Sequence, residues 1–319
     1  PEGLRPGAAG RTVSAAIRFV ERPTAAPARN VVAVLRGSSP ALRGEYVAIG
    51  AHNDHIGILA PVEHDSLRAY NAVMRPEGAN GGGDARPTAG QWSRIRASLD
   101  SLRRLRPARV DSIANGADDD GSGTVALLEI AQSLAAAPRR PARSILFVSH
   151  TGEELGLLGS QYFTDHPTVP RDSIVTQLNM DMVGRGRAED VKGGGPRSIQ
   201  MIGSRRLATE LGDTIDALNA RRAQPMQVDY SFDAPGHPYN RYCRSDHYMY
   251  ARYGIPITYF SAGYHRDYHQ ATDEPQYIDY DHMALIAGFV RDVALAVADM
   301  SHRPVVDHPR PDPHAGCKQ

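Results

Sequence analysis

Side chains that can bind metal ions or carry protons collect directly after apolar runs of this sequence. Two adjacent glutamates, Glu153 and Glu154, follow the run SILFVS at residues 144–149, which has the composition of a buried strand. Adjacent carboxylates repel each other, and glutamate is rarely buried unless it is paired or bound to a metal ion. The end of a core strand is therefore an unusual place for this pair.

Four further groups of metal-capable residues follow the same pattern: His52-Asn53-Asp54-His55, Asp118-Asp119-Asp120, Asp181, and His269. Taken singly, such groups have simpler explanations, since an Asp before Gly-Ser-Gly often caps a helix and first-turn glutamates complement the helix dipole. In open α/β sheets, however, ligand sites lie outside the carboxyl ends of the strands. Five groups at one edge favour a single joint site.

Zinc chemistry accounts for the residue types. Zinc takes histidine nitrogen and carboxylate oxygen, and a catalytic zinc keeps one position for water. Two zinc ions about 3.5–4 Å apart can share a carboxylate and a water that attacks a polarised carbonyl. Consecutive glutamates can then divide the work, because one binds zinc while its neighbour takes the proton from water.

Alternating strand and helix patterns predict the framework around this edge. The predicted strands are 30–37, 45–57, 144–149, 173–184 and 254–263, and the predicted helices are 124–137, 156–163, 205–221 and 280–300. This alternation predicts a single α/β domain with a central, mostly parallel mixed sheet and helices on both faces.

The remaining segments divide the chain further. We expect an N-terminal arm or linker at 1–29, a catalytic domain at 30–302 with an insertion at 61–113, and a Pro-rich tail at 303–319 along the surface. The insertion carries one predicted amphipathic helix, and it either shapes the site mouth, mediates dimer contacts or is a plain surface helix. His64 and Asp65 within it are not assigned to metal.

The bulk composition narrows the classes of protein. The 319 residues have a formal net charge of zero, which gives no support for nucleic-acid or membrane binding, and no apolar run approaches membrane-spanning length. Cys243 and Cys317 lack zinc-finger spacing and can form one disulfide, which the sequence alone does not establish. The start at Pro1, with no Met and no signal peptide, indicates a trimmed N-terminus.

As an ordered set, the motifs resemble those of the co-catalytic di-zinc exopeptidases of metallopeptidase family 28 (clan MH). This family includes secreted leucyl-type aminopeptidases, aminopeptidase Y, glutamate carboxypeptidase II relatives and glutaminyl cyclases. The motifs are GAHNDHIG, NGADDDGSG, TGEELGLLGSQYF, LNMDMVG, RSDHYMYARYGIPITYFS and DYHQATDEPQYID. The resemblance runs from residue 30 to the last predicted helix and implies the zinc-exopeptidase fold.

The resemblance implies two Zn²⁺ ions per chain with a shared carboxylate. His52 and Asp181 are the implied ligands of the first ion, and Glu154 and His269 those of the second. Asp119 is the implied bridge, although Asp118 remains an alternative. Asp120 stands where the family commonly has Asn.

It also implies roles for residues that do not bind metal. Glu153 is similar to the general base, and Tyr268 to a tyrosine that helps to stabilise the oxyanion in some members. Asp54 is expected to hold the His52 imidazole. Asp246 and His247 are expected to support the site or the substrate pocket, or to be structural.

The expected function is a zinc-dependent exopeptidase, and first an aminopeptidase that cleaves N-terminal peptide bonds through a zinc-bridging water. Its partner is then a peptide with a free N-terminus. The alternatives are a carboxypeptidase or dipeptidase of the same family, and a glutaminyl cyclase-like acyltransferase that uses one zinc ion. A secreted or periplasmic bacterial location is expected. The sequence does not reveal the oligomeric state.

Overall fold

The computed structural model describes residues 27–81 and 85–319, so most of the expected arm at 1–29 lies outside the described residues. Seven strands form the main sheet in the order β1-β5-β2-β6-β9-β7-β8. Their bounds are β1 Val31–Leu35, β2 Tyr46–His52, β5 Ser144–His150, β6 Ile174–Met180, β7 Ser198–Ile202, β8 Gln227–Asp229 and β9 Ile257–Ser261.

The four central strands of the sheet, β5, β2, β6 and β9, run parallel to one another. The outer pairs β1–β5 and β7–β9 are antiparallel, which makes the sheet mixed. Strands β5 and β6 are almost wholly buried, as expected for parallel strands covered on both faces. The register pairs His52 with His150 and Met180 with Phe260, so the carboxyl ends of these strands meet at one edge.

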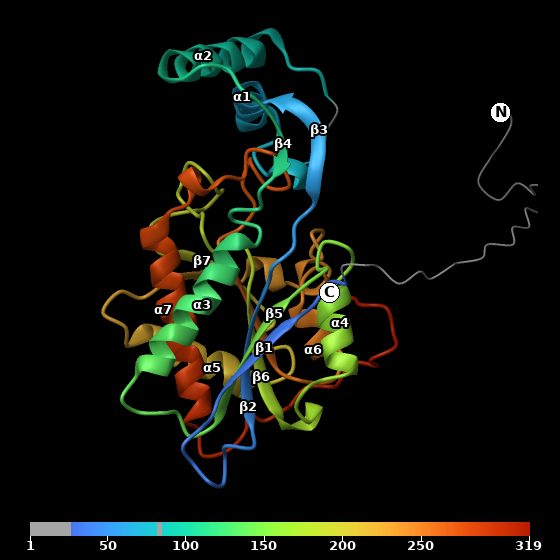
Figure 1. Ribbon diagram of the computed structural model, residues 1–319, viewed down its shortest axis with the longest axis vertical. Coiled ribbons are helices and arrows are strands. Elements are labelled where there is room, and N and C mark those ends of the chain that lie inside the picture. The colour runs from blue at the N-terminus through green and yellow to red at the C-terminus, as the bar shows by residue number, and fades with distance from the viewer. Residues whose placement is uncertain (1–26, 82–84) are drawn as a thin grey trace, which may run out of the picture.

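Helices cover both faces of the sheet, which confirms the predicted fold class. Helices α3 (Gly121–Ala136), α5 (Thr209–Ala220) and α7 (Tyr280–Ala298) lie on one face, and α4 (Leu158–Asp165) and α6 (His247–Ala251) lie on the other (Figure 1). A separate cluster of buried apolar side chains lies on each face. The sheet is thus held between two cores, which fix the edge where the polar residues collect.

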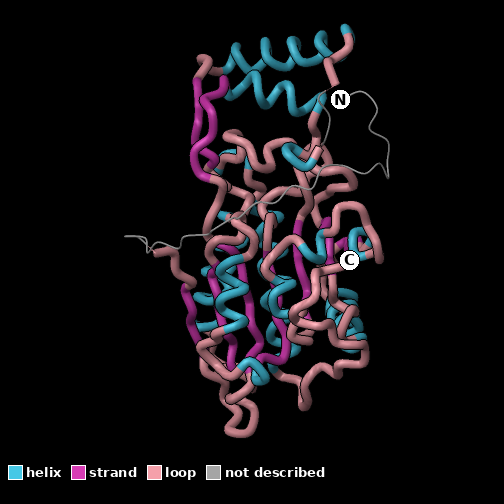
Figure 2. Tube along the Cα trace, turned by 90° about the vertical axis from the view of Figure 1, so that its right-hand side faces the viewer, coloured by secondary structure: helices cyan, strands magenta, loops and turns pink. Residues whose placement is uncertain are grey.

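A lobe projects from this edge beyond the main body. It contains β3 (Gly57–Glu63), α1 (His64–Met74), α2 (Ala89–Leu105) and β4 (Val110–Ala114), with β3 and β4 paired antiparallel. Figure 2 shows the two helices side by side at the far end of the lobe. The predicted helix exists as α2, but the expectation of a single helix is wrong. Helix α1 was not predicted because its buried side chains include polar ones, such as His64 and Asn71. The helix therefore lacks the apolar periodicity on which the prediction relied.

The C-terminal segment after α7 returns to the main body. Cys317 forms a disulfide with Cys243, and the backbone carbonyl of Gln319 accepts a hydrogen bond from Gly236. No helix among the described residues is long and apolar enough to span a membrane.

Candidate metal centre

Three neighbouring parallel strands end at the candidate site. His52 is the last residue of β2, Asp181 directly follows β6, and Glu153 and Glu154 come shortly after β5. Since β2 pairs with both β5 and β6, the three ends lie side by side. The order of the strands in the sheet, rather than closeness in sequence, brings these side chains together.

The start of α3 holds Asp119 in this group. Asp120 is the N-cap of α3, and its carboxylate accepts hydrogen bonds from the backbone nitrogens of Gly123, His52 and Met182. It therefore ties α3 to the ends of β2 and β6. Asp119 is joined to Asp120 by a cis peptide bond and lies at the centre of the site.

Asp118 faces another partner. Its carboxylate lies 3.0 Å from Nε2 of His265 and accepts a hydrogen bond from the backbone of Gly184 at 2.6 Å. Of the two residues considered for the bridging position, only Asp119 contacts histidines on both sides of the site.

The loop after β9 supplies His269 and Tyr268. The lobe contacts this loop directly, because the backbone nitrogen of Ala79 donates to the carbonyl of Tyr268 at 3.1 Å, and the Asn71 amide donates to the carbonyl of Arg266 at 3.2 Å. The insertion thus lies against the segment that carries two candidate site residues.

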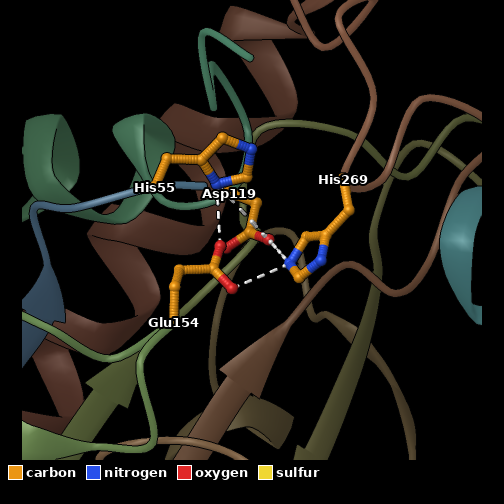
Figure 3. Close-up of side chains that lie close together, drawn as sticks. All are labelled: His55, Asp119, Glu154 and His269. Atoms are coloured by element: carbon orange, nitrogen blue, oxygen red, sulfur yellow. Dashed lines mark ion pairs between the residues drawn. The ribbon is translucent and has the colours of Figure 1, made fainter. Parts of the chain in front are cut away.

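The two oxygens of Asp119 face different histidines. Oδ1 lies 3.1 Å from Nε2 of His52, and Oδ2 lies 3.0 Å from Nε2 of His269. Asp181 approaches His52 at 3.9 Å, and Glu154 approaches His269 at 3.0 Å. The carboxylate of Asp119 therefore stands between two groups of candidate ligands, and Figure 3 shows the second of them.

The donor atoms fit bound cations. Nε2 of His52 and Oε1 of Glu154 are buried and have no hydrogen-bond partner among the described residues. Nδ1 of His52 lies 3.1 Å from the carbonyl oxygen of Asp54, so a proton on Nδ1 leaves the lone pair of Nε2 free for a metal. Ligands of one shared metal ion bring their nitrogen and oxygen atoms close together without hydrogen bonds between them, as these side chains do.

Burial and charge shift the pKa values of the metal-free site in opposite directions. Burial alone would lower the pKa of His269, but Asp119 and Glu154 raise it to about 9. Burial works against the charge of Asp119 too, yet the two histidines hold its pKa well below the ordinary value. For Asp181, burial dominates and raises the pKa. The histidines and Asp119 thus stabilise one another's charges in the metal-free site, whereas burial favours the neutral form of Asp181.

Glu153 has a different environment from its neighbour Glu154. No ion pair joins its carboxylate to another side chain in the described part of the chain, and it lines the pocket. Burial raises its pKa well above the ordinary value, and the charges of Asp181 and Asp246 add to this effect. A carboxylate outside the ligand groups with a raised pKa suits proton transfer.

The Asp54 carboxylate does not hold the His52 imidazole as expected. The backbone carbonyl of Asp54 lies nearer to the imidazole, and the carboxylate oxygen is 3.8 Å away. The Asp54 carboxylate instead accepts hydrogen bonds from the backbone nitrogens of Glu153 and Glu154.

Asp246 and His247 are both buried, at the start of α6. Asp246 lies 3.4 Å from Nδ1 of His150 and influences Glu153 through its charge. His247 packs against the ring of Tyr259, and burial lowers its pKa to about 3. His247 is therefore neutral at physiological pH.

A pocket of about 310 Å³ opens over the site. Its lining includes Glu153, Glu154, Asp119, Asp181 and His269 together with Tyr259, Tyr264, Tyr268, Arg241 and Arg244. The ring of Tyr268 stacks on His269, with the ring centroids 4.0 Å apart. Arg244 donates to the Tyr268 hydroxyl oxygen at 3.4 Å. Carboxylates, an imidazole, phenols and guanidinium groups thus share one small cavity.

His55 also belongs to this site, although the sequence reasoning gave it no role. Its Nδ1 lies 2.8 Å from Oε1 of Glu154 (Figure 3). The available signal was its place three residues after His52, in a stretch already noted as metal-capable. The spacing does not predict where the His55 side chain points, because the chain between the two histidines is neither helix nor strand.

Comparisons with known proteins identify the family. A family model described as Peptidase family M28 matches residues 30–294. A probable leucine aminopeptidase of Arthroderma otae is 30% identical over 214 residues, which cover 63% of this chain and 53% of that protein. The chain spans about half the length of the curated leucine aminopeptidases that it matches.

Solved structures resemble the fold. The LapA aminopeptidase of Legionella pneumophila has a TM-score of 0.53 at 19% identity, covering 86% of this chain and 55% of that one. A glutaminyl cyclase of Porphyromonas gingivalis has a TM-score of 0.51 at 18% identity, covering 83% and 76%. At such identities the likeness concerns the fold alone.

Proposed function

The chain belongs to peptidase family M28, and we propose that it is a zinc-dependent aminopeptidase that removes residues from the amino termini of peptides. The observation that carries this proposal is the position of Asp119, whose two oxygens face His52 and His269 at 3.1 and 3.0 Å. A single carboxylate between two groups of ligands suits a pair of metal ions better than one.

In this proposal the chain holds two zinc ions. His52, Asp119 and Asp181 would hold the first, and Asp119, Glu154 and His269 would hold the second. When bound, the ions supply Lewis-acid polarisation of the scissile carbonyl and lower the pKa of water. The two-ion set also argues against the cyclase alternative, which uses one zinc ion.

Glu153 serves as the general base and then the general acid. Its carboxylate takes a proton from the attacking water and delivers it to the leaving amine. Its backbone is fixed by Asp54, and its side chain is left out of the ligand groups. In the metal-free site, burial raises the pKa of Glu153 well above its ordinary value.

Tyr268 donates a hydrogen bond to the oxyanion that develops on the substrate carbonyl. The hydroxyl oxygen of Tyr268 accepts from Arg244, which leaves its proton free for the substrate. Stacking on His269 holds the ring beside the second group of ligands. Hydrogen-bond donors placed where charge develops commonly contribute a large part of the rate enhancement.

The substrate class can be tested with a panel. A cavity of about 310 Å³ is at the small end of ligand pockets and suits one terminal residue with its scissile bond. We expect hydrolysis of aminoacyl-nitroanilides and no hydrolysis of the same compounds with acetylated amines. Equal rates on blocked and free substrates would contradict an aminopeptidase.

A dipeptidase is the second candidate, because two guanidinium groups in the pocket lack acidic partners. Neither Arg241 nor Arg244 makes an ion pair with a carboxylate within residues 27–81 and 85–319. Arg244 is exposed at the pocket, where it can bind the carboxylate of a dipeptide. Under this alternative, Arg244→Ala raises KM for dipeptides far more than for aminoacyl-nitroanilides.

A secreted or periplasmic location is part of the proposal. The Cys243–Cys317 disulfide supports it, since such bonds persist mainly in oxidising compartments. Labelling of free thiols in protein taken from its native compartment tests this directly. Reactive cysteines in that protein would count against export.

A further inference from the structure

His55 is a third imidazole at the second group of ligands. Its side chain is 8% exposed, and its Nδ1 lies 2.8 Å from Oε1 of Glu154 and 4.0 Å from Oδ2 of Asp119. The ring meets His269 edge-on, with centroids 5.4 Å apart and planes at 80°. Figure 3 shows both imidazoles directed at the carboxylates of Asp119 and Glu154.

The contact between His55 and Glu154 is close but is not a hydrogen bond. Both Nδ1 of His55 and Oε1 of Glu154 are buried without a hydrogen-bond partner among the described residues. An unsatisfied buried polar atom is destabilising, so two of them side by side need an explanation. Ligand atoms bound at about 2.0–2.2 Å to one tetrahedral zinc ion lie about 3.3–3.6 Å apart, so a shared ion would need only a small outward shift of Nδ1 and Oε1.

The backbone around His55 makes room for the ring. Gly116, on the loop before α3, has a φ of +59°, and a Cβ added there would lie 2.6 Å from Cγ of His55. Glycine at this position therefore permits both the turn and the close approach of the imidazole. The loop that delivers Asp119 and the chain that leaves β2 thus fit together around the ring.

We propose that His55 is a ligand of the second metal ion, in addition to Asp119, Glu154 and His269. The four side chains each offer a ligand atom, and these atoms all lie within 4.8 Å of one another. Among the residues that the structure describes, the first group offers His52, Asp119 and Asp181 only. The inference depends on the proposed two-ion site but extends its set of ligands.

The unequal numbers of ligands would give the two ions different affinities. Four protein ligands form the closed set typical of structural zinc sites, whereas three leave a position open, as in catalytic sites. The ion beside His55 is therefore the more tightly held, and the ion beside His52 and Asp181 is the more easily removed.

X-ray absorption of the wild-type protein loaded with zinc tests the inference without any variant. Three histidines on two ions give about 1.5 imidazoles per zinc, whereas His52 and His269 alone give about 1.0. A value near 1.5 supports ligation by His55, and a value near 1.0 overturns it. This measurement still decides if variants at position 55 fail to fold.

Metal titration of the metal-free His55→Ala and His55→Gln variants gives a second test. The exposed neighbour Asn53, whose amide donates to Ser149, provides the matched control Asn53→Ala. We expect the tighter zinc Kd to rise by at least about 100-fold in both His55 variants, and to stay unchanged in the control. Two ions bound by His55→Ala with wild-type Kd values would overturn the inference.

These readouts are independent of catalysis. A chain with about 1.5 imidazoles per zinc that hydrolyses no peptide would refute the proposed function while leaving His55 as a ligand. An active aminopeptidase with about 1.0 imidazole per zinc would support the proposed function and refute His55 as a ligand.

Discussion

Oδ1 of Asp54 lies 3.1 Å from the backbone nitrogen of Glu153. The other oxygen of this carboxylate lies 3.3 Å from the backbone nitrogen of Glu154. Since Asp54 follows β2 and the glutamates follow β5, one side chain fixes the bend after β5 relative to His52. The proposed base and a proposed metal ligand thus share a single anchor, and their spacing from the other candidate ligands depends on it.

Replacing Asp54 should therefore reduce turnover without removing a ligand. In Asp54→Ala both backbone amides lose their acceptor, and we expect kcat to fall by about 100-fold because the base is displaced. Asp54→Asn keeps one acceptor oxygen and should lose less. Steady-state kinetics with metal analysis measures this, and Asn53→Ala is the control. Wild-type kcat in Asp54→Ala would show that the anchor is dispensable.

The variant Glu153→Gln tests the role of Glu153 as general base separately from metal binding. The amide cannot take a proton from water, so we expect kcat to fall by about 1,000-fold while both ions remain bound. Glu129→Gln, at an exposed position on α3, is the control and should behave as wild type. Full activity in Glu153→Gln, with its metal content verified, would remove Glu153 from this role.

The lobe should influence catalysis through Gly78. This residue has a φ of +55°, and an added Cβ would lie 2.4 Å from the carbonyl oxygen of Tyr268. We expect Gly78→Ala to cost about 1–3 kcal/mol in unfolding free energy and to lower kcat, because Tyr268 and His269 are displaced.

Gly81→Ala is the matched control for this prediction. A Cβ at Gly81 would meet no atom closer than 3.5 Å, and its φ is −76°. Thermal unfolding and kcat should therefore stay within error of wild type. Equal behaviour of the two alanine variants would mean that the lobe does not position the loop after β9.

Acid should weaken the lobe through Asp65. This side chain is 1% exposed and contacts His64 and Arg106. Burial would raise its pKa, but Arg106 and His64 outweigh burial and lower it. The stabilisation is therefore present above the unfolded-state pKa of about 3.9 and is lost as the pH falls through the lower folded-state value.

Urea unfolding between about pH 2 and pH 6 measures this effect. The unfolding free energy of Asp65→Asn should be lower than that of wild type at pH 6, and the difference should shrink below about pH 4. Asp100→Asn, at an exposed position on α2, should show no such change. A constant difference between Asp65→Asn and wild type across this range would contradict the prediction.

The sequence was sufficient to predict the sheet and most of the residues that converge at its edge. Apolar runs mark β2, β5 and β6, and parallel neighbours bring His52, Glu154 and Asp181 together whatever their separation in the chain. The N-cap preference of aspartate before Gly-Ser-Gly similarly agrees with Asp120, which caps α3.

Features that depend on the path of loops could not be predicted in this way. The ring of His55 can approach Glu154 because residue 116 is a glycine, with no side chain in the way. Hydrophobic periodicity in a sequence gives no information about such a contact between loops. The pairing of Cys243 with Cys317 spans 74 residues and depends on how the tail returns to the body. Helix α1 was missed because its buried residues include polar ones.

The most direct test of the account is the number of metal ions per chain, measured together with activity on a substrate that has a free amine. We predict about two zinc ions per chain, loss of activity on chelation, and recovery as both ions return. A chain that binds no more than one ion when active, or that carries two ions and hydrolyses no amide offered to it, would contradict the account.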